Sequence, residues 1–166
     1  MSVNISYYQI LDPQFFGYVR ESLEKYDISG ENLIFEITET HYDESPMKVR
    51  EFIDGCRSLG IRVAIDDFGD GYSSLAFLLK HSSDIVKLDK SLIGEMLSSD
   101  DNENFINSII YACHRFGKKI CAEGVETDDE YKAIKIAGAD MIQGYYFYKP
   151  LELPVFYDLL SEGMKI

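Results

Sequence analysis

Residues 62–75 read Arg-Val-Ala-Ile-Asp-Asp-Phe-Gly-Asp-Gly-Tyr-Ser-Ser-Leu. The apolar run before the first aspartate is typical of a buried strand, and the glycines after Phe68 indicate a loop. Adjacent carboxylates repel each other, so Asp66 and Asp67 indicate either a divalent metal site or a pair of helix-capping aspartates. The stretch therefore predicts a strand over residues 62–66 whose carboxyl end carries candidate metal ligands.

The same strand-then-helix pattern continues on both sides of this stretch. We expect five more strands, over residues 2–6, 33–37, 84–88, 119–123 and 140–143. Five amphipathic helices are predicted: one opened by Asp12-Pro13, one stopped at Gly60, a long one ending at Gly117, one begun by a capping box at Thr127 to Glu130, and one over residues 153–160. Six β-then-α units in one direction imply a parallel sheet covered by helices.

Two architectures fit such a sheet: an open doubly wound sheet, or part of a (β/α)8 barrel. No glycine-rich phosphate loop follows the first strand, which argues against a dinucleotide-binding open sheet. Six polar residues stand at or near the carboxyl ends of six different strands, and a barrel rim gathers such side chains at one active site. They are Asn4, Glu36, Asp66, Lys87, Glu123 and Gln143. We therefore predict an α/β fold, a partial TIM-like barrel of about six units.

Composition limits the function classes. The chain has 166 residues, 46% of them hydrophobic, which suits a single domain over residues 1–166. A formal net charge of −13 argues against binding nucleic acid polymers or anionic membranes, and leaves a non-phosphate ligand or a metal site. Three cysteines without a CxxC pair fit a reducing cytoplasm, and we find no membrane-spanning or signal segment.

The polar strand ends have both ordinary and functional interpretations. Asn4 can be a structural hydrogen-bonding residue, Glu36 and Lys87 a buried salt bridge, and Gln143 a turn residue. Taken together, however, these oxygen ligands suit hard cations such as Mg²⁺ or Mn²⁺, and none of the three histidines has a ligand spacing. Acids around a lysine at a barrel rim favour metal-assisted attack of water on a phosphate ester.

Six motifs extend this interpretation over essentially the whole chain. They are Val3–Ser6, Phe35–Glu39, Asp66–Leu75, Val86–Asp89, Ala122–Thr127 and Gln143–Tyr145. Their order and spacing resemble those of the EAL phosphodiesterase family, and the Asp66–Leu75 and Ala122–Thr127 blocks are the most specific.

The resemblance implies a reaction and a set of roles. The family opens cyclic di-GMP to linear pGpG with Mg²⁺ or Mn²⁺ at a two-metal site. Asn4, Glu36 and Asp66 match metal ligands, and Asp67 matches the residue that helps to hold the second metal. The remaining matches are Glu123 as general base or second-metal ligand, Lys87 as the residue that orients the attacking water, Glu39 as the brace of the loop from Phe68 to Leu75, Gln143 near metal-bound water and substrate, and Glu126 in the same block as Glu123.

Two departures from the family pattern modify this expectation. Asp70 stands where a threonine or small residue is common, which affects the loop conformation. The two family strands that precede the Asn4 strand, one bearing the Glu-Ala-Leu glutamate, have no counterpart here. We interpret the chain as a truncated EAL domain that is inactive or nearly so by itself, from a cytoplasmic parent fused to sensory or GGDEF domains. The alternative is an inactive EAL module that binds cyclic di-GMP or a protein partner.

An incomplete barrel also predicts self-association. A closed barrel has no free edges, whereas six strands leave one edge along residues 2–6 and another along residues 140–143. We expect apolar barrel-interior side chains at the gap, among them Val3, Ile5 and Met141. The chain is therefore expected to be a homodimer or a larger oligomer.

Overall fold

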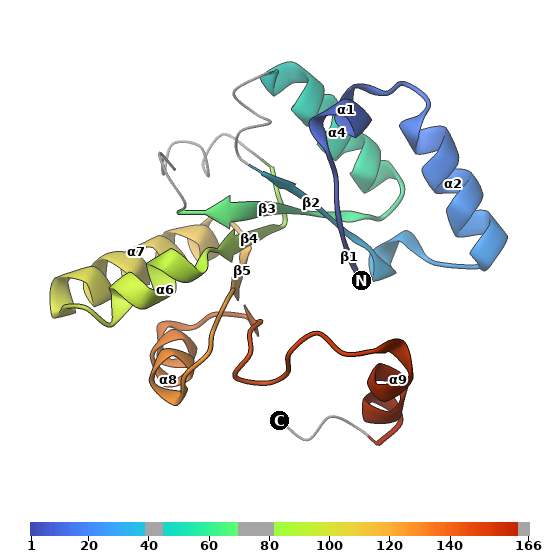
Figure 1. Cartoon of the computed structure of the whole chain (residues 1–166). Helices are drawn as coiled ribbons and strands as arrows, with labels where there is room; N and C mark the ends of the chain where they lie inside the picture. The colour runs from blue at the N-terminus through green and yellow to red at the C-terminus, as the bar shows by residue number, and fades with distance from the viewer. Residues whose placement is uncertain (39–44, 70–81, 163–166) are drawn as a thin grey trace.

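The computed structural model describes residues 1–38, 45–69 and 82–162, and shows one six-stranded parallel sheet in the strand order β1-β2-β3-β4-β5-β6 (Figure 1). The strands are β1 (Ser2–Asn4), β2 (Ile34–Thr38), β3 (Arg62–Phe68), β4 (Ile85–Leu88), β5 (Lys119–Ala122) and β6 (Met141–Ile142). Neighbours in sequence are neighbours in the sheet, as in a (β/α) barrel and unlike an open doubly wound sheet, whose strand order reverses. The predicted partial barrel is confirmed.

Helices follow the strands, and those before the last one lie beside the sheet (Figure 1). They are α1 (Tyr7–Leu11), α2 (Phe15–Tyr26), α4 (Pro46–Ser58), α6 (Lys90–Met96), α7 (Asp100–Arg115), α8 (Asp128–Ala137) and α9 (Leu153–Glu162), with a 3₁₀ turn over Gly30–Asn32. In Figure 1, α1, α2 and α4 lie beside the β1–β3 half of the sheet, while α6, α7 and α8 lie beside the β4–β6 half.

Two helices were not separately predicted, and local capping explains both. Ser6 and Gln9 form a capping box at the start of α1. The single long helix expected after the fourth strand is two helices, because Asp89 caps α6 by accepting the Ser91 amide and Ser99 caps α7 by accepting the Asn102 amide. The capping box predicted at Thr127 and Glu130 is confirmed at α8.

The sheet has two apolar faces of unequal size. The larger cluster lies between the sheet and the helices and includes Phe35, Ile65 and Val86. The smaller cluster lies on the concave face, where Ala64, Ile85 and Cys121 meet the partly buried Ile34 and Met141. Because side chains alternate along a strand, Glu36, Asp66 and Lys87 share the concave face with this smaller cluster.

Two of the three side chains expected in the barrel interior, those of Ile5 and Val3, lie elsewhere. Ile5 packs in the helix-side cluster instead of the barrel interior. Val3 lies in register with Phe35, a helix-side residue, while Ser2 lines the concave cavity, so Val3 also points away from the interior. Met141 is placed as expected. The pairing of β1 with β2 decides which of its side chains face the interior, and the residues of β1 alone do not show this.

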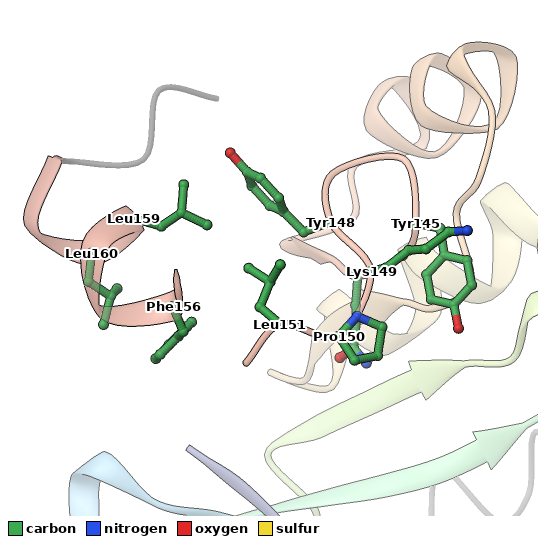
Figure 2. Close-up of a pocket in the computed structure, with 10 residues that line it drawn as sticks. Tyr145, Tyr148, Lys149, Pro150, Leu151, Phe156, Leu159 and Leu160 are labelled. Carbon is green, nitrogen blue, oxygen red and sulfur yellow. The ribbon is translucent and has the colours of Figure 1, made fainter. Parts of the chain in front are cut away.

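The last helix packs less closely than the others. Every described side chain of α9 is exposed except the half-buried Leu159. Between α9 and the loop after β6 lies an open apolar cavity of about 340 Å³ (Figure 2), lined on one side by Tyr148, Pro150 and Leu151 and on the other by Phe156 and Leu160. Within the described ranges, no helix is long and apolar enough to cross a membrane.

Candidate metal and catalytic site

An irregularity at the end of β3 allows two consecutive aspartates to serve one site. Ile65 pairs with Val86 and Phe68 with Leu88, so two residues of β3 stand opposite the single residue Lys87 of β4. This is a β-bulge, and Asp67 in it has a left-handed backbone with φ of 55°. In a regular strand, successive side chains point to opposite faces. Here a carboxylate oxygen of Asp66, one of Asp67 and one of Glu123 all lie within 4.8 Å of one another.

Lys87 connects the carboxylates that come from different strands. Its Nζ lies 2.8 Å from Glu36 Oε2 on β2, 2.7 Å from Asp66 Oδ1 on β3 and 2.9 Å from Glu123 Oε1 at the end of β5. The side chain of Lys87 is only 8% exposed. Burial by itself would lower the pKa of Lys87, but its close contacts with Asp66, Glu123 and Glu36 outweigh burial and raise that pKa above its ordinary value. Lys87 is therefore a fixed positive charge.

Glu123 follows β5 and is held from both sides. Its amide donates to Leu88 O on β4 at 3.0 Å, and the chain then turns sharply at Gly124, which has φ of 64°. Burial raises the pKa of the Glu123 carboxyl, the contact with Lys87 opposes this, and the negative charges of Asp66 and Glu36 add to the increase. A carboxyl with a raised pKa is a stronger base once ionised, as a general base requires.

The residues present fit a divalent cation. Asp66 Oδ1 is buried and lies 2.7 Å from Lys87 Nζ, and a carboxylate oxygen with one such neighbour keeps a second lone pair for a cation. Lys87 contacts three carboxylates, those of Glu36, Asp66 and Glu123, and Asp67 adds a fourth beside two of them, so the described residues of the site keep an excess of negative charge. All of these donors are oxygens, which Mg²⁺, Mn²⁺ and Ca²⁺ prefer over zinc-type ligand sets.

The other predicted site residues lie in different places relative to this group. Asn4 is exposed at the end of β1, in register beside Glu36 of β2. Gln143 directly follows β6 and lines the same cavity as Glu36 and Lys87. Glu126 lies outside the carboxylate group, with its Oε1 3.9 Å from Lys90 Nζ at the surface. Glu39 and the loop positions from Asp70 to Leu75 lie outside the described residues.

Below the carboxylates, the concave face encloses an open cavity of about 170 Å³, with Ser2 and Met141 among its lining residues. Cys121 forms part of its wall, and burial, with the neighbouring Glu123 adding to the effect, raises the pKa of its thiol to about 12. The sequence analysis did not mark Cys121 as part of the site. The signal was present, because Cys121 stands two residues before Glu123 and therefore shares its face of the strand.

Several known proteins are similar to this chain in sequence or in structure. The sequence profile described as "EAL domain" matches residues 1–150. The cyclic di-GMP phosphodiesterase PdeF of Escherichia coli K12 is 32% identical over 152 residues, which are 92% of this chain and 20% of PdeF. The EAL enzyme Bd1971, solved with cAMP and cyclic di-GMP bound, is 33% identical with a TM-score of 0.89, covering 96% of this chain and 42% of that one.

A second similar structure was solved with a metal. Klebsiella pneumoniae BlrP1, solved with manganese and cyclic di-GMP, is 29% identical with a TM-score of 0.83, covering 90% of this chain and 38% of BlrP1. The chain spans about a fifth of the length of the curated relatives it matches.

Proposed function

Since the chain belongs to the EAL-domain family, we propose that it forms the greater part of the catalytic barrel of a cyclic-di-GMP phosphodiesterase, which hydrolyses cyclic di-GMP to linear pGpG. One observation carries the proposal: Lys87 joins Glu36, Asp66 and Glu123 from three different strands into one buried group. A structural salt bridge needs one acid for one base. Three acids around one base, with Asp67 beside them, make a charge pattern that a divalent cation would complete.

The cofactor is Mg²⁺ or Mn²⁺ at a two-metal site. Asp66 and Asp67 would hold one ion between them beside Glu123, and Glu36 with Asn4 would provide further oxygen ligands for the site. When bound, the cations lower the pKa of a water molecule and neutralise charge on the phosphate oxygens. The donor set supports hard cations, and BlrP1 was solved with manganese in the same family.

The residues of the chain have distinct tasks in hydrolysis. Glu123, whose pKa is raised by burial, accepts the proton of the attacking water. Lys87 holds Glu36, Asp66 and Glu123 in place and orients the attacking water through these carboxylates. The water oxygen bonds to phosphorus, the bond from phosphorus to the ribose O3′ breaks, and O3′ takes up a proton as pGpG is formed. Gln143, which lines the same cavity as Glu36 and Lys87, would contact the substrate.

The wider setting of the domain is part of the proposal. The chain spans only about a fifth of its curated relatives, which supports a parent protein with further domains, sensory or GGDEF in type. The three buried, unpaired cysteines support a reducing, cytoplasmic location. The open edges of β1 and β6 support a homodimer or larger assembly.

The test is hydrolysis of cyclic di-GMP by the protein that carries this domain, with pGpG followed by chromatography. Glu123→Gln should lower turnover by about 100-fold or more, because it removes the base that accepts the proton of the water. Glu103→Gln, the same change in the exposed first turn of α7, should leave turnover unchanged. The 166-residue chain alone should show little activity, because β1 and β6 do not close the sheet around the site. Binding of cyclic di-GMP without any product in Mn²⁺ at alkaline pH would instead establish the inactive module.

A further inference from the structure

The first turn of α6 fills the space between the two loops that carry Asp67 and Glu123. On one side Leu92 packs directly on Gly69, where an added Cβ would lie 2.2 Å from Leu92 Cδ1. On the other side the aliphatic stem of Lys90 packs on Gly124, where an added Cβ would lie 2.4 Å from Lys90 Cβ. Both loops therefore meet α6 as bare backbone, and neither glycine leaves room for a side chain.

Backbone hydrogen bonds connect the start of α6 to both loops as well. The Asp89 amide donates to Phe68 O at 3.1 Å, and the Glu123 amide donates to Leu88 O at 3.0 Å. The Asp89 carboxylate accepts from the Ser91 amide at 2.8 Å, which fixes where the helix begins. Hydrogen bonds on both sides of α6 therefore fix the position of Leu92 relative to the bulge.

The bulge needs such support because its conformation is unfavourable. A left-handed backbone at a residue with a Cβ costs on the order of 1 kcal/mol, even though aspartate tolerates it better than most residues. Gly69, two residues after Asp67, has φ of 109°, which is restricted to glycine in practice. If the space beside Gly69 were empty, the loop could relax to an ordinary strand conformation. The Asp67 side chain would then alternate away from Asp66.

We propose that Leu92 is a positioning residue for the candidate metal centre: by packing on Gly69 it holds Asp67 in the left-handed conformation that brings its carboxylate beside Asp66 and Glu123. The inference deepens the proposed function and rests on it to the extent that this centre binds a divalent cation. Leu92 itself offers no ligand atom, so its effect is on geometry alone.

The test compares four forms of the 166-residue chain by calorimetric titration with Mn²⁺. Leu92→Ala should weaken Mn²⁺ binding by about tenfold, equivalent to roughly 1.4 kcal/mol. Leu92→Met, which conserves volume, should restore near wild-type affinity. Ile93→Val is the matched control, because Ile93 is 1% exposed in the same turn and packs in the helix-side core. It should lower the melting temperature and leave Mn²⁺ affinity unchanged.

A second measurement is independent of metal. In the metal-free chain, Leu92→Ala should accelerate hydrogen exchange at the backbone amides of residues 66–69, whereas Ile93→Val should not. Equal Mn²⁺ affinity in wild type and Leu92→Ala, or equal loss in Ile93→Val, would overturn the positioning role. If the wild-type chain binds no Mn²⁺, the proposed metal centre fails, and the exchange rates alone decide whether Leu92 holds the bulge.

Discussion

The ammonium of Lys87 has three hydrogens and three carboxylate neighbours, Glu36, Asp66 and Glu123, at 2.8, 2.7 and 2.9 Å. Removing the Lys87 ammonium would leave these three carboxylates facing one another in a buried site. Loss of one partner from a buried ion pair typically costs about 3–5 kcal/mol, since the remaining charge is left without compensation. Lys87 is therefore as much a structural residue as a functional one.

We expect Lys87→Met to lower the free energy of unfolding of the metal-free chain by about 3–5 kcal/mol, measured by urea denaturation in the presence of a chelator. Lys90→Met is the control, because Lys90 is exposed and 3.9 Å from its partner Glu126, and it should cost less than about 1 kcal/mol. A Lys87→Met protein as stable as wild type would mean that the three acids are protonated or hydrated in the metal-free state.

The identity of the rim residues could be predicted from sequence, but their arrangement could not. Glu36, Asp66, Lys87 and Glu123 were expected at strand ends, and the structure joins them through one ammonium. The left-handed backbone of Asp67 has no local signature. It follows from the pairing of β3 with β4 and from the packing of a helix that lies more than twenty residues later in the chain.

Among the elements, β4 and β6 start in a similar way. Asp84 precedes β4, and its Oδ2 accepts the amide of Val63 in the neighbouring β3 at 2.8 Å. Asp140 precedes β6, and its Oδ2 accepts the amide of Ile120 in the neighbouring β5 at 2.8 Å. Each carboxylate satisfies a backbone donor at the amino end of the sheet, opposite to the rim that carries the candidate site. These aspartates therefore stabilise strand pairing and take no part in the chemistry.

The charge of Asp140 should make the stability of the fold depend on pH. Burial opposes ionisation, but the Ile120 amide and His114, whose Nε2 lies 2.9 Å away, outweigh it and lower the pKa of Asp140. Because its pKa is lowered in the folded state, ionised Asp140 stabilises the fold at any pH above the ordinary aspartate pKa. This stabilisation is lost as the pH falls through the lowered pKa. Wild type should therefore melt higher than Asp140→Asn near neutral pH, and the difference should begin to shrink below about pH 4 and vanish once the pH lies below the lowered pKa. A difference that is constant over this range would rule out the charge of Asp140 as its cause.

The strands and helices differ in how well the sequence predicted them. All six strands were expected, because apolar runs of β-branched residues bounded by turns are a strong local signal. The seven-residue α6 was not predicted separately from α7, since Gly94 in its middle weakens the helical pattern. The five-residue α1 was missed, although Ser6 with Gln9 three residues later is a capping-box pattern that could have indicated it.

At the scale of the whole molecule, the described sheet has two strands with only one neighbour each, β1 and β6. Unpaired strand edges offer backbone donors and acceptors to a second chain. Apolar side chains accompany these edges, with Val3 36% exposed on β1, and Phe156 and Leu160 of α9 exposed at the cavity beyond β6 (Figure 2). A net charge of −13 opposes association, so a contact must bury enough of this surface to outweigh repulsion.

We predict that the 166-residue chain is a dimer or larger at micromolar concentration, with at least one contact along an open edge, as measured by light scattering coupled to size exclusion. Val3→Lys should shift the population toward monomer, because a lysine at an edge strand disfavours pairing with another chain. Asn104→Lys adds the same charge on the exposed face of α7, away from both edges, and should leave the oligomer intact. If wild type is a monomer with a high melting temperature, the six strands protect their own edges. If both lysine variants dissociate equally, the contact lies elsewhere and net charge alone controls it.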